Sequence, residues 1–221
     1  MIDLLIRYLP MILKGFLQTV QLTFFGVLVG LVLGILLAIG DLYGGRVAST
    51  IIKFYVEFFR GSPLVVQLFI FYFSIPSMLN ILIDNFTVGL IVFALNSAAY
   101  QKGYIKGAME SVYEDQMTAA LSLGLSKVQA IRHVVLPQAL RIVIPAWSNE
   151  FCSLAKSTAA VLLIGIPDLT SALKSIGSWT FRGLETYTFG ALIYLLWISA
   201  VIKTLDILYS KVKIPGIEIT A

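Results

Sequence analysis

The chain has 221 residues, of which 58% are hydrophobic and only 13% are charged, and its net charge is +4 at pH 7. Soluble domains average about 25% charged residues, so this composition excludes an ordinary soluble domain and indicates a protein embedded in lipid. The modest positive charge forms no polybasic run, and a single histidine and a single cysteine supply no His/Cys metal site, so we expect neither nucleic-acid binding nor a bound metal.

The first predicted transmembrane helix is the stretch 15–40, which carries no charge and exceeds the about 20 apolar residues that span a bilayer core. Three glycines at four-residue spacing, Gly26, Gly30 and Gly34, would let a neighbouring helix of the same chain pack closely against it. A charged connector follows, and it contains a predicted amphipathic helix at 51–59 that would lie at the membrane interface.

The second predicted span, 61–83, and the third, 85–101, are each bounded by charged residues. The second opens with Arg-Gly-Ser-Pro-Leu at residues 60–64, and a proline is tolerated at a helix start because its missing amide is free there anyway. We expect Arg60 to anchor at the lipid headgroups rather than to gate a substrate. Gln67 and Asn96 are polar side chains inside these two spans.

A polar stretch at 111–133 separates the third span from the fourth. Ser111 and Glu114 fit a capping box that would start a helix at about residue 112. Gly124 is a left-handed stop for that helix, and Ser126 with Gln129 repeats the box and starts a second helix. These features alone leave open an interfacial loop between two membrane helices and a docking surface for a partner.

The spacing within this stretch is specific. The pair Ala119-Ala120 is followed after three residues by Gly124, and the step Leu136-Pro137 comes later. This pattern resembles the cytoplasmic coupling loop of binding-protein-dependent ABC importer permeases, which reads Glu-Ala-Ala, three residues, Gly, nine residues, Ile-x-Leu-Pro. The resemblance implies that the short helix docks into a cleft of an ATPase subunit. Thr118 stands where that family has Glu.

A second match lies at residues 60–64, which resemble the Arg-Gly-Thr-Pro-Leu signature of polar amino acid permeases within the same family. The chain also departs from that pattern: Gly103 replaces a Glu, Lys106 an Arg, and Ser157 an Asp. These departures indicate a divergent branch or a different coupling chemistry. The resemblance assigns contact with the ATPase to Asp115, Gln116, Thr118, Ala119, Ala120, Leu123, Gly124, Leu136 and Pro137.

The fourth predicted span, 138–166, is interrupted, because Pro137 and Pro145 each remove a backbone amide and kink the helix. The fifth, 186–202, follows an amphipathic external segment, 168–185, in which Trp179 and Phe181 would anchor at the interface. If the coupling loop is cytoplasmic, the N-terminus is outside and the C-terminus inside. Eleven Lys and Arg residues then face the cytoplasm and four lie outside, as the positive-inside rule requires.

Three polar residues of the fourth span, Asn149, Glu150 and Lys156, lie at membrane depth. A charge there is unfavourable by several kcal/mol unless it is paired or wet. Glu150 and Lys156 are six residues apart and on roughly opposite helix faces, so they do not form an ion pair along one helix. On one interpretation, the translocation path of a zwitterionic solute is lined by these three residues together with Asn96 and Gln67. The other makes them structural links to Asn96, to Gln67 or to a neighbouring subunit.

The sequence therefore predicts an all-α integral membrane protein with five transmembrane helices in one domain, 1–221, and a cytoplasmic coupling loop between helices 3 and 4. The resemblance implies a permease subunit of a polar amino acid ABC importer in the plasma membrane. It implies as partners a second permease of the same or another chain, cytoplasmic ATPase subunits and an extracytoplasmic solute-binding protein. The chain has no phosphate loop or catalytic motif, so it would bind no cofactor and a partner would use the ATP.

Two other classes remain compatible with the residues. A secondary transporter or channel for a small polar solute would need no ATPase, so copurification with an ATPase separates it from an importer. An intramembrane enzyme using Glu150 or His133 would show activity without nucleotide. Neither explains the coupling-loop pattern and the string at 60–64 together.

Overall fold

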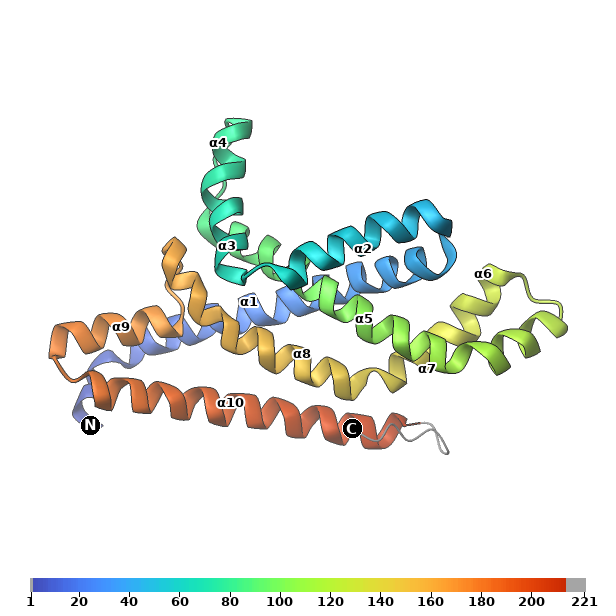
Figure 1. Cartoon of the computed structure of the whole chain (residues 1–221). Helices are drawn as coiled ribbons and strands as arrows, with labels where there is room; N and C mark the ends of the chain where they lie inside the picture. The colour runs from blue at the N-terminus through green and yellow to red at the C-terminus, as the bar shows by residue number, and fades with distance from the viewer. Residues whose placement is uncertain (1, 214–221) are drawn as a thin grey trace.

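The computed structural model describes residues 2–213, and for residues 2–5 and 113–115 only the backbone. The described residues form helices and connections without strands. The α-helices, drawn in Figure 1, are α1 (Ile2–Tyr43), α2 (Gly45–Gly61), α3 (Leu64–Phe69), α4 (Ile75–Leu79), α5 (Asn85–Ser122), α6 (Lys127–Ala130), α7 (Leu136–Ile142), α8 (Ile144–Ser157), α9 (Leu169–Thr180) and α10 (Gly183–Val212). Two π-helical stretches, Ile70–Ser74 and Ile131–Val135, and a 3-10 helix, Thr158–Ile164, join some of them. The predicted all-α class is confirmed.

The long helices α1 and α5 are the central pair of the fold, and the glycines of α1 lie where they meet. A Cβ atom on Gly26 would lie 3.0 Å from Phe93, and one on Gly30 would lie 2.9 Å from Ser97. A Cβ on Gly34 would lie 3.0 Å from Gln101. The prediction that this stripe serves packing within the chain is confirmed, because the Cβ atoms of α5 approach these glycines too closely to leave room for a side chain there.

A buried cluster of charged side chains joins α1 and α5 near the C-terminal end of α1. Lys102 and Lys106 of α5 both contact one carboxylate oxygen of Asp41 in α1, at 2.6 Å and 2.9 Å. Ser49 of α2 donates a hydrogen bond of 2.6 Å to the other oxygen. The Asp41 side chain is only 1% exposed, so its charge depends on these partners. No local sequence signal pairs Asp41 with the two lysines, which follow it by more than sixty positions.

The chain turns by 106° between α2 and the arm formed by α3 and α4. Pro63 precedes the first residue of α3 in an extended conformation, and Ser62 ends α2 in the same way. The arm leaves the body of the molecule in Figure 1. It carries exposed apolar side chains on its outer side, among them Phe73 and Met78.

The predicted capping box at Ser111 and Glu114 is wrong, because α5 continues without a break through these residues to Ser122. Neighbouring side chains such as Met109 and Val112 are buried in the core. Because this packing favours a continuous helix, the capping-box pattern does not start a new one here. Ser111 instead donates its hydroxyl to the carbonyl of Ala108.

The predicted helix stop at Gly124 and the predicted capping box after it are confirmed. Gly124 has a φ of +84°, and its amide and that of Leu125 bond back to Leu121 and Ala120, which ends α5 in a Schellman motif. Ser126 and Gln129 form the capping box that begins α6. This turn protrudes at one end of the molecule, and α9 lies at the other end (Figure 1).

The fourth predicted span is broken as the prolines predict. Pro137 lies in the first turn of α7, and Pro145 in the first turn of α8 after a break at Val143. The 3-10 helix that follows α8 turns by 57° into α9. Asp168, fully buried, caps α9 by accepting hydrogen bonds from the amides of Thr170 and Ser171.

Among the described helices, two are long and apolar enough to cross a membrane, α1 and α10, or up to four if each bent pair forms one span. The predicted spans fall on α1, on the α3–α4 arm, on the first half of α5, on α7 with α8 and the 3-10 helix, and on α10. Because α5 carries polar residues such as Asn96, Gln101 and Lys102, it does not count among the apolar helices. The number of five spans therefore stays a prediction.

The α1–α5 packing predicts that Gly30→Ala lowers the stability of the fold. The added Cβ would overlap Ser97 at 2.9 Å, and overpacking of this kind destabilises by about 1–3 kcal/mol. Gly107→Ala is the matched control, because a Cβ there meets nothing within 4 Å. Thermal unfolding of the detergent-solubilised protein should show a lower Tm for Gly30→Ala alone. Equal melting of the two variants would contradict the close packing.

Candidate functional site

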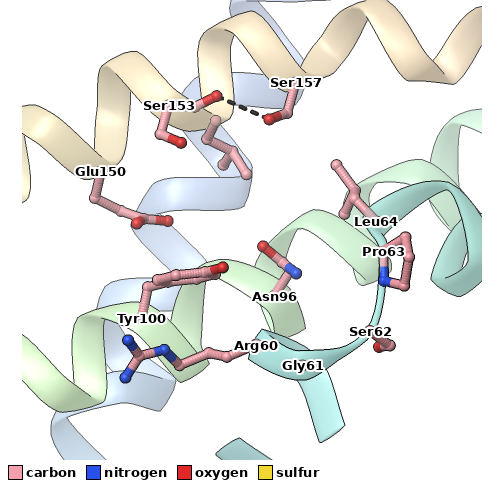
Figure 2. A pocket seen from close by; sticks show the side chains of 11 residues that line it. Arg60, Gly61, Ser62, Pro63, Leu64, Asn96, Tyr100, Glu150, Ser153 and Ser157 are labelled. Carbon is pink, nitrogen blue, oxygen red and sulfur yellow. Dashed lines mark hydrogen bonds between the residues drawn. The ribbon is translucent and has the colours of Figure 1, made fainter. Parts of the chain in front are cut away.

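A cavity of about 390 Å³ opens beside the bend between α2 and α3. Ligand sites occupy about 300–1,000 Å³, so this space suits a small solute. Polar side chains form most of its wall, as Figure 2 shows. The lining residues are Arg60, Gly61, Ser62, Pro63, Leu64, Asn96, Tyr100, Glu150, Ser153, Leu154 and Ser157.

Glu150 supplies the negative charge of the cavity. It lies on α8, is 4% exposed, and accepts a hydrogen bond of 2.8 Å from the hydroxyl of Ser97 on α5. Figure 2 shows its carboxylate directed toward the cavity. One hydrogen bond leaves most of the acceptor sites of a carboxylate unused, so Glu150 can still bind a donor in the cavity.

Arg60 supplies the positive charge. Its guanidinium lies over the ring of Tyr100, 5.0 Å from the ring centroid, and Figure 2 draws that ring between Arg60 and Glu150. Neither charged group forms an ion pair within 4 Å among the described residues. The cavity thus has one unpaired charge of each sign, and the expectation that Arg60 only anchors at headgroups does not account for its place in the wall.

Asn96 and Gln67 brace the bend. The side-chain amides of Gln67 and Asn96 both donate to the carbonyl of Phe59, at 2.8 Å and 3.1 Å, and Asn96 also donates to the Gln67 oxygen. Gln67 donates further to Ser62 and is completely buried. Of the two interpretations of these residues, the structural link describes Gln67, whereas Asn96 both braces the bend and lines the cavity.

Asn149 and Lys156 do not line the cavity. Their side chains are exposed on α8, together with Ser153 between them. The spacing of four and three residues puts all three on one helix face, and Ser153 is also part of the cavity wall. The structure therefore separates Glu150, which is buried, from a polar stripe that consists of Asn149, Ser153 and Lys156.

The predicted coupling residues gather around the turn between α5 and α6 and at the start of α7. Gln116, Thr118, Ala119, Leu123, Gly124 and Pro137 are exposed, Leu136 is half-buried and Ala120 is buried. The side chain of Asp115 lies outside the described residues. The tip also exposes Leu121 and Val128, so it presents an apolar surface to whatever packs there.

Of the polar and charged side chains in the cavity wall, Asn96 and Glu150 were predicted to lie on the solute path, whereas five were not: Arg60, Ser62, Tyr100, Ser153 and Ser157. A usable signal existed for Tyr100, which follows Asn96 by four residues and therefore shares its face of α5. No comparable local signal existed for Arg60, because the turn after it decides where its side chain points.

The match to a known family decides the class of the chain. The family model described as "Binding-protein-dependent transport system inner membrane component" matches residues 30–213. The chain belongs to this family. The predicted resemblance is thereby confirmed, and the family description also supports a membrane location.

Similar proteins cover most of the chain. The glutamine transport system permease protein GlnP of Escherichia coli K12 is 34% identical over 189 residues, covering 85% of this chain and 86% of its own. The arginine transport system permease protein ArtQ of Bacillus subtilis is 35% identical over 189 residues, with 86% of each covered. A probable amino-acid ABC transporter permease protein of Vibrio harveyi, PatM, is 32% identical over 95% of this chain and 94% of its own.

Solved structures share the fold. A chain from the crystal structure of an amino acid ABC transporter with histidines has a TM-score of 0.84 and 33% identity, and the match covers 94% of this chain and 96% of that one. A chain of the MetNI methionine ABC transporter in an inward-facing conformation has a TM-score of 0.73 at 17% identity, and the match covers 93% and 98% of the two chains. The second likeness concerns the fold alone.

Proposed function

We propose that this chain is the permease subunit of an ABC importer for a small polar amino acid, and that a separate ATPase drives it. The family membership and the relatives named for glutamine and arginine transport support this function. The observation that carries the proposal is that Glu150 and Arg60, two opposite charges with no ion-pair partner within 4 Å among the described residues, line one cavity of about 390 Å³.

The cavity matches the chemistry of a zwitterion. The ammonium group of an amino acid would donate to Glu150, and its carboxylate would accept from the guanidinium of Arg60. The hydroxyls of Ser153 and Tyr100 offer further partners in the same wall. A free amino acid would thus satisfy both protein charges, which otherwise depend on water.

The polar stripe on α8 would continue the path of the solute beyond the cavity. A lysine exposed toward lipid at membrane depth would be unfavourable by several kcal/mol, so Lys156 with Asn149 and Ser153 would face water or a second permease. The second permease would close the path from the opposite side, as a copy of this chain or a related one. The solute would then lie at the boundary between two subunits.

The turn between α5 and α6 would transmit conformational changes of the ATPase to the permease. Its exposed Leu121, Leu123 and Val128 form an apolar tip that would insert into a cleft of the ATP-binding subunit. The chain itself would bind no nucleotide or other cofactor, and ATP would be hydrolysed by that partner. An extracytoplasmic binding protein would deliver the solute at the opposite end, near α9.

The proposed topology follows from this arrangement. With the α5–α6 turn in the cytoplasm, the described helices would make five spans of the plasma membrane, with the N-terminus outside and the C-terminus inside. The bent pairs would each count as one crossing, and α5 would cross despite its polar residues because α1, α2 and α8 cover them. The charge asymmetry of the sequence supports the same direction.

The cavity predicts that Glu150→Gln reduces uptake of the amino acid by about 10- to 100-fold, because a hydrogen bond to a charged group contributes about 1.5–3 kcal/mol. Glu57→Gln, the same change at an exposed position of α2, should leave uptake unchanged. Radiolabelled amino acid uptake into proteoliposomes that contain the full importer and ATP would measure both. Normal uptake by an assembled Glu150→Gln importer would refute a role of Glu150 in the path.

The coupling turn predicts that Gly124→Arg abolishes transport while the protein still enters the membrane. The arginine would put bulk and charge on the apolar tip and weaken ATPase binding. Gly45→Arg is the matched control, since Gly45 also has a positive φ, +78°, and open space around it. Copurification with the ATPase and uptake should fall only in Gly124→Arg. Similar losses in both variants would indicate backbone strain instead, and an active Gly124→Arg importer that needs no ATPase would favour a secondary transporter or channel.

The topology predicts that a cysteine at Ser122 reacts only from the cytoplasm and one at Ser178 only from outside. Both positions are exposed, near opposite ends of the molecule. The native Cys152 is buried and would be replaced by alanine in the parent protein. Labelling with a membrane-impermeant maleimide on intact and on opened cells distinguishes the two sides. Reversed labelling would overturn the orientation.

A further inference from the structure

We propose that Gln101 is a positioning residue of the solute site, which orients the hydroxyl of Ser97 toward Glu150 and so keeps that carboxylate ready for the ammonium group of a solute. This role rests on the proposed function of the Glu150 cavity. Gln101 does not line the cavity and is only 1% exposed. It would act through Ser97, which lies about one helical turn before it on α5.

A continuous chain of hydrogen bonds leads from α1 to the cavity. The Nε2 group of Gln101 donates to the carbonyl of Val27 on α1 and to the hydroxyl of Ser97, each at 2.9 Å. Ser97 in turn donates to Oε1 of Glu150 on α8 at 2.8 Å. The three side chains of this chain are buried. One set of hydrogen bonds therefore joins three helices and ends on the acid of the proposed solute site.

The direction of the Ser97 hydroxyl differs from that of other helical serines in this structure. Ser122 and Ser148 donate to the backbone carbonyl four positions earlier in their own helices, a frequent choice of serine in a helix. Ser97 donates to another helix instead. The amide of Gln101 binds one lone pair of the Ser97 oxygen, which restricts the rotation of the hydroxyl and favours the direction toward Glu150.

Packing alone does not explain a glutamine at this position. The oxygen of its side chain, Oε1, is buried and accepts no hydrogen bond among the described residues, and an unsatisfied buried acceptor is unfavourable. The carbonyl of Val27 lies within α1, where backbone carbonyls are already bonded along the helix, so it does not need Gln101. An apolar side chain of similar length would avoid the unsatisfied oxygen. The donation to Ser97 is therefore the property that only the amide supplies.

The orientation of Ser97 matters for the solute because of its effect on Glu150. A buried carboxylate stays charged only where donors or cations compensate it, and Ser97 provides such a donor. The bond involves only Oε1, so the other carboxylate oxygen stays open to a donor in the cavity. The ammonium group of an amino acid would bind there. The hydrogen-bond chain would thus set how strongly the site prefers a solute that carries an ammonium group.

The test measures equilibrium binding to the complex of permease and ATPase in lipid nanodiscs, without the solute-binding protein, so that the Kd belongs to the permease. The probe is the radiolabelled amino acid that the unaltered complex binds most tightly among the twenty. Gln101→Met keeps the length of the side chain and removes its donors, and it should raise the Kd about two- to tenfold, as expected for one hydrogen bond. Gln18→Met, the same change on α1 beside a different pocket, should leave the Kd unchanged.

The same compound without its amino group separates positioning from packing. Used as a competitor, it should bind to Gln101→Met at least as well as to the unaltered complex, because it has no ammonium group to place against Glu150. A purely structural role of Gln101 would weaken the binding of both compounds alike, and that result would overturn the proposal.

Ser97→Ala tests the middle of the hydrogen-bond chain. It should raise the Kd for the amino acid by a similar factor, and the double variant should raise it no further, since Gln101 acts through Ser97. If Gln101→Met does not assemble, an unchanged Kd in Ser97→Ala would by itself overturn the proposal.

Glu150→Gln distinguishes this role from the function of the cavity. Binding that is weakened by Glu150→Gln but not by Gln101→Met would refute the role of Gln101 alone. A complex that binds none of the twenty amino acids would refute the proposed function, and the role of Gln101 with it.

Discussion

The carbonyl oxygen of Phe59 lies where the chain turns by 106°, and the rest of the site depends on how this oxygen is satisfied. A helix that ends within a membrane leaves backbone groups that water cannot reach. Here Gln67 and Asn96 both donate to that oxygen, one from the helix after the turn and one from α5. This pair of hydrogen bonds holds α2 and α3 against α5, and the cavity forms in the angle between them. Arg60, at the last turn of α2, points into the cavity because the turn follows it at once.

Two kinds of interaction determine this structure, those between residues close in sequence and those between distant segments, and only the first kind is predictable from the sequence. Signals that act within a few residues were predictable: the capping box at Ser126, the left-handed Gly124 and the break at Pro145. The box at Ser111 failed although it has the same pattern, because Met109 and Val112 continue the buried face of α5 through it. Helical propensity and packing outweigh a local cap when the residues on both sides are already helical.

The charged residues of the cavity were even less predictable from the sequence. The sequence places Glu150 and Lys156 on different faces of one helix, and this much was predictable from spacing. Which face turns inward depends on α5, whose Ser97 bonds to Glu150. The opposite charge of the cavity comes from α2, ninety positions earlier in the chain. Pairing across such separations has no local signature, so the sequence predicted a polar path in α8 and favoured headgroup anchoring for the arginine that lines the cavity beside it.

The cluster around Asp41 has a consequence for how the protein is made. The acid emerges from the ribosome at the end of α1, and Lys106 follows it by 65 residues. Until α5 is made, this carboxylate lacks the two lysines that it contacts in the fold, and an unpaired carboxylate is unfavourable when it is buried. The last turn of α1 would therefore reach its final position only when α5 packs against it, which would couple the assembly of these two helices.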